Sequence, residues 1–144
     1  MTPREDAGLD ELYQEVILDH TRRPRNFRVI EQARTGEGHN PLCGDHISVY
    51  VRVEHDVIAD IGFQGTGCAI CTASASLMTE NVKGKTIPDA QALSDRLQRM
   101  LVTPPGRPVD PLGALTALAG VRLFPIRIKC ATLAWQALGA ALSG

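Results

Sequence analysis

The stretch ISVYVRVEHDVIADIGF, residues 47–63, decides the fold of this chain. Apolar and polar residues alternate through residues 47–54, and this period of two is typical of a half-buried strand. Residues 57–63 form a second apolar run, and only His55 and Asp56 separate it from the first. So short a connection predicts an antiparallel hairpin. Helices must then cover one face of the sheet, which favours an α+β fold.

Helical patterns lie on both sides of this hairpin. Residues 9–20 predict an amphipathic helix, which Pro24 would bring to an end. After the hairpin, apolar spacing, proline starts and glycine ends predict four more helices, over residues 69–83, 86–101, 110–120 and 126–141. The last of these could begin anywhere from Pro125 to Lys129. Before the hairpin, Gly36 and Gly38 predict a segment with few steric limits that is mobile without a metal.

Composition places the protein among ordinary globular chains. The 144 residues suit a single domain, residues 1–144, and 44% are apolar and 22% charged. The chain has 15 basic and 16 acidic residues, and the basic residues form no long run, so nucleic acid is not an expected partner. No apolar run reaches about 18 residues, and no apolar segment follows a basic start, so we expect no membrane partner and a cytoplasmic protein.

Four cysteines in a reducing compartment favour metal ligands or reactive thiols over disulfides. Cys43 and Asp45 flank Gly44 in a short turn, and this glycine would let both side chains face one point. Cys68 and Cys130 would complete a tetrahedral set of three thiolates and one carboxylate, a donor set suited to zinc. By periodicity alone Cys130 is a core residue, and the Cys-Gly-Asp spacing alone is a weak signal.

Cys68 lies where a helix is expected to begin, and the unpaired N–H groups of a helix start favour a thiolate. It also forms a Cys-x-x-C motif with Cys71, which raises a thioredoxin-like redox function as an alternative. That function requires a strand-helix-strand unit, whereas the preceding strands predict a hairpin. We therefore expect Cys71 to pack one turn into the helix, and we expect His46 to point away from a site that Asp45 faces.

Several separate motifs resemble the SufU branch of the IscU/NifU-type iron–sulfur cluster assembly family. They are the runs LYQEVILDH at 12–20, GHNPLCGD at 38–45, GCAI at 67–70, ASAS at 73–76, VKGK at 82–85 and RIKCATLAW at 127–135. The resemblance covers nearly the whole chain. It implies the SufE/IscU-like fold, in which an antiparallel sheet of about three strands packs against helices.

The resemblance also implies a metal site and a function. By position, Cys43, Asp45, Cys68 and Cys130 match the zinc ligands of the family, and Cys43 matches the cysteine that receives a persulfide. Arg127 is expected near the site, where it would steady negative charge. The implied partners are a SufS-like, pyridoxal-phosphate-dependent cysteine desulfurase and a downstream SUF scaffold or apo iron–sulfur protein.

At one position this sequence differs from the scaffold-type members of the family, and the difference bears on which of two functions to expect. Scaffold-type members carry a histidine immediately before the last cysteine, whereas Lys129 stands here. We therefore expect a zinc-dependent sulfur acceptor. The alternative is a scaffold that holds iron or a [2Fe-2S] cluster transiently on the same cysteines. A third possibility is that zinc only holds the fold together.

Overall fold

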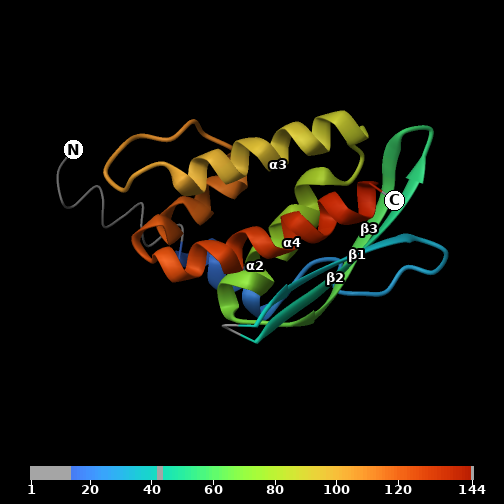
Figure 1. Ribbon diagram of the computed structural model, residues 1–144, viewed down its shortest axis with the longest axis horizontal. Helices are drawn as coiled ribbons and strands as arrows, with labels where there is room; N and C mark the ends of the chain where they lie inside the picture. The colour runs from blue at the N-terminus through green and yellow to red at the C-terminus, as the bar shows by residue number, and fades with distance from the viewer. Residues whose placement is uncertain (1–13, 42–43, 144) are drawn as a thin grey trace.

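The computed structural model describes residues 14–41 and 44–143 (Figure 1). Residues 14–22 are helical, so the first part of the predicted 9–20 helix lies outside the described residues. The remaining elements are the strands β1 (Arg34–Asn40), β2 (Asp45–Glu54) and β3 (Val57–Thr66), the helices α2 (Ala69–Val82), α3 (Ile87–Val102) and α4 (Pro125–Ser143), and the 3-10 helix η1 (Gly113–Leu123).

The predicted hairpin is β2 and β3, and it forms the centre and one edge of a three-stranded antiparallel sheet in the order β1-β2-β3. His55 and Asp56 make the turn with φ of 53° and 65°, the left-handed geometry that two-residue hairpin loops require. Ile47, Val49 and Val51 are almost fully buried on the inner face. This arrangement confirms the α+β fold class and the antiparallel sheet.

The expectation of a mobile segment around Gly36 and Gly38 is wrong, because these residues form part of β1. Both glycines are buried and face α4. A Cβ at Gly36 would collide with the carbonyl oxygen of Ala137, and one at Gly38 would lie 2.8 Å from the carbonyl oxygen of Leu133. The glycines therefore let a helix backbone approach the strand closely, and they do not provide flexibility.

The C-terminal helix α4 is the centre of the core. It runs across β1 and β2 on one side and packs against α2, α3 and η1 on the others (Figure 1). Trp135 and Leu138 are among its fully buried side chains, and most of its other buried residues are alanines. Small residues on several faces suit a helix that is surrounded by other elements.

The helix boundaries follow the predictions except in one case. Thr86 caps α3 through its hydroxyl, which accepts a hydrogen bond from the Asp89 N–H at 3.2 Å. The helix predicted over 110–120 is instead a 3-10 helix, and it continues beyond Gly120 to Leu123. Leu115 and Leu118 are buried three residues apart, a spacing that both helix types share and that could not distinguish them.

A buried group of hydrogen-bonded polar side chains joins the N-terminal helix to α2. The Nδ1 atom of His20 lies 2.7 Å from the Ser76 hydroxyl, which also accepts a hydrogen bond from the Arg25 N–H at 2.8 Å. Glu80 lies 3.6 Å from the other ring nitrogen. Burial, aided by the nearby charge of Arg25, holds the pKa of His20 below its ordinary value of 6.5.

This lowered pKa predicts a loss of stability in mild acid. Well above pH 6.5 His20 is neutral in both the folded and the unfolded chain. Below pH 6.5 the unfolded chain binds a proton that the folded chain resists, so the free energy of unfolding should fall as the pH drops. Urea unfolding of wild type and His20→Gln across this range measures the effect, and the stability of the variant should decline less steeply. Parallel curves would contradict the prediction.

Within the described residues, no helix is both long enough and apolar enough to span a membrane.

Candidate metal centre

Three of the predicted metal ligands meet at one end of the sheet. A carboxylate oxygen of Asp45 and the Sγ atoms of Cys68 and Cys130 all lie within 4.8 Å of one another. The three residues come from the start of β2, the start of α2 and the first half of α4. Elements distant in sequence therefore bring together the chemical groups that zinc prefers.

Asp45 reaches the interior because β2 begins with it. The preceding Gly44 has a φ of 70°, a left-handed conformation that most residues adopt only with strain. Strand alternation then buries the Asp45 side chain completely and leaves His46 exposed on the opposite face. His46 therefore points away from the cluster, as the sequence predicts.

The Asp45 carboxylate is only half satisfied by the protein. Its Oδ1 accepts a hydrogen bond from the backbone N–H of Cys68 at 3.0 Å. Its Oδ2 is buried, and no hydrogen-bond donor of the described residues reaches it. A buried polar atom without a partner costs about 1–3 kcal/mol, and more when it is charged. A cation at this position would supply the missing partner.

Cys68 is the N-cap residue of α2, as the predicted helix start requires. Its side chain makes no capping hydrogen bond, so the sulfur is not used to cap the start of the helix. The neighbouring Gly67 leaves the space that the site needs. A Cβ at Gly67 would lie 2.9 Å from the sulfur of Cys71 and 3.2 Å from Oδ1 of Asp45.

Cys130 is fully buried on α4, and a side-chain link fixes α4 against α2. The indole N–H of Trp135 donates to the Ser74 hydroxyl at 3.1 Å, and that hydroxyl donates to the carbonyl of Ala131 at 2.5 Å. This link holds in register the two helices that carry Cys68 and Cys130. Sequence periodicity carries no signal of these hydrogen bonds.

The structure leaves untested the two residues that we expect to act directly in the chemistry. Cys43 lies outside the described residues, although its neighbour Gly44 leads directly into Asp45. Arg127 is exposed in the first turn of α4, three residues before Cys130. Their roles as sulfur acceptor and as a stabilising charge therefore remain predictions.

Cys71 packs one turn into α2, as expected, and is fully buried against Gly67. The element order places α3 after α2, and the described sheet is entirely antiparallel. The strand-helix-strand context of a thioredoxin-like motif is therefore missing from the described part of the chain. Cys71 supports the wall of the site without belonging to the ligand cluster.

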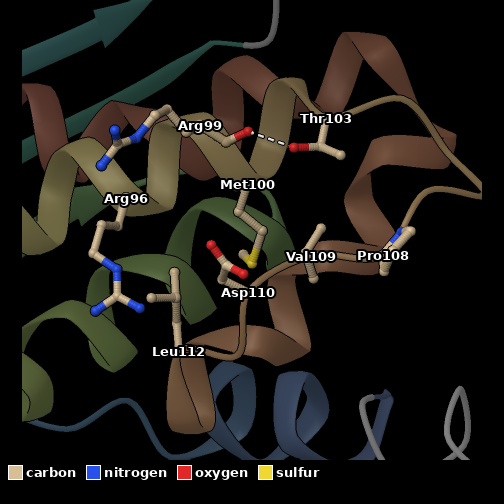
Figure 2. Close-up of a pocket in the computed structure, with 8 residues that line it drawn as sticks. All are labelled: Arg96, Arg99, Met100, Thr103, Pro108, Val109, Asp110 and Leu112. Atoms are coloured by element: carbon tan, nitrogen blue, oxygen red, sulfur yellow. Dashed lines mark hydrogen bonds between the residues drawn. The ribbon is translucent and has the colours of Figure 1, made fainter.

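Among the surface hollows near the helices, two are alternative candidate sites, and neither is lined by Asp45, Cys68 or Cys130. One, of about 290 Å³, lies between the C-terminal half of α3 and the connection that follows it (Figure 2). The other, of about 250 Å³, is mainly apolar and includes Ile70, Leu123 and Phe124.

The residues present fit a zinc ion. Two thiols and a carboxylate provide three of four tetrahedral ligands, and a cation would pair with the buried Oδ2 of Asp45, which has no hydrogen-bond partner among the described residues. Thiolates also suit iron, so the donor set alone does not exclude an iron–sulfur cluster.

Comparisons with known proteins agree with this geometry. The chain is 43% identical over 136 residues to the zinc-dependent sulfurtransferase SufU of Bacillus subtilis (strain 168), covering 92% of this chain and 90% of that protein. It is also 43% identical over 136 residues to the iron-sulfur cluster assembly scaffold protein IscU of Streptococcus pyogenes serotype M1, covering 94% of this chain and 86% of that protein.

A crystal structure gives the same result for the fold. It is that of a proposed iron-sulfur cluster assembly scaffold protein for the SUF system of the thermophile Fervidobacterium islandicum AW-1. The TM-score is 0.82 at 34% identity, over 89% of this chain and 94% of that chain. Residues 12–144 match the sequence profile of the family described as the NifU-like N terminal domain. Because this match spans nearly the whole sequence, the chain belongs to the NifU-like N-terminal domain family, which confirms the resemblance that its motifs carry.

Proposed function

We propose that this protein is a zinc-dependent sulfur acceptor of iron–sulfur cluster assembly, acting as a single domain in the cytoplasm. Cys43 would receive sulfur from a SufS-like, pyridoxal-phosphate-dependent cysteine desulfurase. Cys43, Asp45, Cys68 and Cys130 would hold the metal. The observation that carries the proposal is the buried Oδ2 of Asp45, which has no hydrogen-bond partner among the described residues and lies beside two thiols.

The four ligands differ in how they are attached to the fold. Cys68 and Cys130 belong to helices that the Ser74 and Trp135 side chains hold together. Cys43 lies outside the described residues, and in the sequence it directly precedes Gly44, which has a φ of 70° and leads into β2. The sequence predicts a turn at Cys43, and a ligand on a turn can leave the metal with less disturbance of the core than a ligand on a buried helix. Cys43 is therefore the ligand best suited to be released for reaction.

The transfer is an exchange between a thiolate and a persulfide. Bound zinc would keep the cysteines deprotonated, because it is the thiolate that coordinates the metal. The Cys43 thiolate would attack the outer sulfur of the desulfurase persulfide. A new sulfur–sulfur bond forms, the old one breaks, and the electron pair leaves on the desulfurase cysteine as a thiolate. Cys43 then carries the persulfide for a downstream scaffold or apo iron–sulfur protein, and Arg127 would steady the negative charge.

Removing the thiol of Cys43 tests the proposal directly. Cys43→Ala should abolish the increase in desulfurase turnover that the wild-type protein produces, because no acceptor thiolate remains. Turnover is measured as alanine released from cysteine. Mass spectrometry of the wild-type protein after reaction should find one added sulfur atom on the peptide that contains Cys43.

Cys71→Ala is the matched control, because it also removes a thiol near the site but not a proposed ligand. It should retain the stimulation of the desulfurase. If Cys43→Ala stimulated turnover as strongly as wild type, the proposed acceptor role would be wrong.

The cluster scaffold remains the second candidate, since a thiolate-rich site also suits iron and one relative is named as a scaffold. Anaerobic reconstitution with iron and sulfide distinguishes the two. A stoichiometric [2Fe-2S] cluster that passes to an apo acceptor would favour the scaffold. Lys129, at the position where scaffold members carry histidine, favours sulfur transfer.

A purely structural zinc is the third possibility, and chelation separates it from the other two. The core includes Cys130, but it extends well beyond the ligand cluster, over the sheet, α2, α3, η1 and the rest of α4. We therefore expect metal-free protein to keep its far-ultraviolet circular dichroism. Complete unfolding on zinc removal would instead favour a structural role.

A further inference from the structure

Two histidines and a glutamate form a separate exposed cluster where β1 ends and β2 begins. They lie on the face of the sheet opposite the buried Asp45 side chain. His39 in β1 and His46 in β2 are directly opposite one another in the antiparallel register. Their ring centroids are 5.7 Å apart, with the rings edge to face. Glu37 lies two residues before His39, so strand alternation places it on the same face.

The first two donor groups of this cluster already have suitable spacing for one ion. Oε1 of Glu37 lies 3.3 Å from Nε2 of His46. Nitrogen and oxygen atoms bound to the same zinc ion, at about 2.0–2.2 Å each, lie about 3.3 Å apart in tetrahedral geometry. The Ser48 hydroxyl donates to the same Glu37 oxygen at 3.2 Å, which orients the carboxylate.

His39 can provide the third ligand after a side-chain rotation. Directly opposed residues of an antiparallel pair have Cβ atoms about 4.5–5.5 Å apart, so two imidazoles can reach one ion between them. In the structure the His39 nitrogens do not yet converge with the other two donors. Both histidines are exposed, and exposed side chains change rotamer within nanoseconds.

We propose that His39, His46 and Glu37 form a second, solvent-exposed binding site for a divalent transition-metal ion, with zinc as the expected occupant. Two imidazoles and one carboxylate are typical zinc ligands, and an exposed site with three protein ligands leaves a position for water or another ligand. Because His46 and Asp45 point to opposite faces of β2, the exposed site and the buried cluster cannot share one ion.

The exposed site differs from the buried one in affinity and in ligand chemistry. It contains no thiolate and is surrounded by water, so it should bind zinc more weakly than the cluster of Asp45, Cys68 and Cys130. It should also bind Ni²⁺, which imidazole ligands accommodate well. A zinc titration of the full chain should therefore show a tight first equivalent followed by a weaker second one.

The test is equilibrium dialysis of the full chain against Zn²⁺, with bound metal measured by mass spectrometry, for wild type and His39→Ala/His46→Ala. Wild type should bind the second equivalent at micromolar free zinc, and the double variant should bind only the first. Each single variant should weaken the second site at least tenfold, since both imidazoles contribute. Thermal unfolding should confirm that these exposed substitutions leave the fold intact.

His55→Asn is the matched control. It removes another exposed imidazole at the far end of the hairpin, and asparagine tolerates the left-handed conformation there. This variant should keep both zinc equivalents. Equal zinc binding by wild type and the double variant, loss of the second equivalent in His55→Asn, or loss of the first equivalent in the double variant would each overturn the proposal.

Discussion

Replacing Asp45 with asparagine is expected to lower zinc affinity by at least about 100-fold, because loss of an outer-shell partner alone costs about 10–100-fold and Asp45 is proposed as a direct ligand. The same change should raise the melting temperature of the metal-free protein. Stability without metal and affinity for metal should therefore change in opposite directions.

The reason is the unequal environment of the two Asp45 oxygens. Oδ1 accepts the hydrogen bond from the Cys68 N–H, and asparagine can keep that bond through its own oxygen. Oδ2 is buried without a hydrogen-bond partner among the described residues, and asparagine replaces this half of a buried charge with a neutral amide group. Burying an unpaired charge costs more than burying a neutral group, so metal-free protein is strained at this position.

Competition with a chromophoric chelator measures the zinc affinity, and thermal unfolding with and without the chelator measures the stability. Asp60→Asn serves as the control, because Asp60 is also largely buried but is paired with Arg28 at 2.6 Å and Lys83 at 3.4 Å. That variant should lose stability with unchanged zinc affinity. If Asp45→Asn bound zinc as tightly as wild type, Asp45 would not be a ligand.

The hairpin and the helices could be predicted because their residues repeat with the period of the element. Alternation in residues 47–54 requires one buried face, and the extended apolar run at 57–63 completes the hairpin. β1 gave no such signal, since Gly36 and Gly38 occupy the positions where buried apolar side chains would reveal a strand. Their buried partner is the backbone of α4, a long-range contact that local sequence does not encode.

The metal site was predictable to a different degree for each ligand. Cys68 could be placed at a helix start from local pattern alone, and α2 does begin there. Cys130 lies on a helix that is apolar on several sides, so its pattern is that of a core residue, and only the fold brings it to Asp45. The space provided by Gly67 and the burial of the Asp45 side chain depend on three-dimensional packing, which periodicity cannot describe.

The close packing of β1 on α4 leads to a large expected effect on stability. Gly36→Ala should destabilise the protein by about 3 kcal/mol or more, the upper end of the range for overpacked cores. The added Cβ would collide with the carbonyl oxygen of Ala137 and would lie 2.5 Å from the backbone nitrogen of Ala141. Both atoms belong to the backbone of α4, so rotation of a side chain cannot relieve the clash.

Gly139→Ala is the matched control, because it makes the same chemical change in α4, the helix that Gly36 packs against, but in open space. A Cβ at Gly139 meets no atom within 4 Å, and alanine is favoured over glycine inside a helix by about 1 kcal/mol. Thermal unfolding of zinc-loaded protein should therefore give a Tm for Gly36→Ala roughly 10 °C below wild type and a slightly raised Tm for Gly139→Ala. Equal Tm values for the two variants would contradict the packing role of Gly36. The close approach of β1 to α4 also fixes the face from which α4 presents Cys130, so zinc affinity of Gly36→Ala should fall together with its stability, whereas Gly139→Ala should keep both.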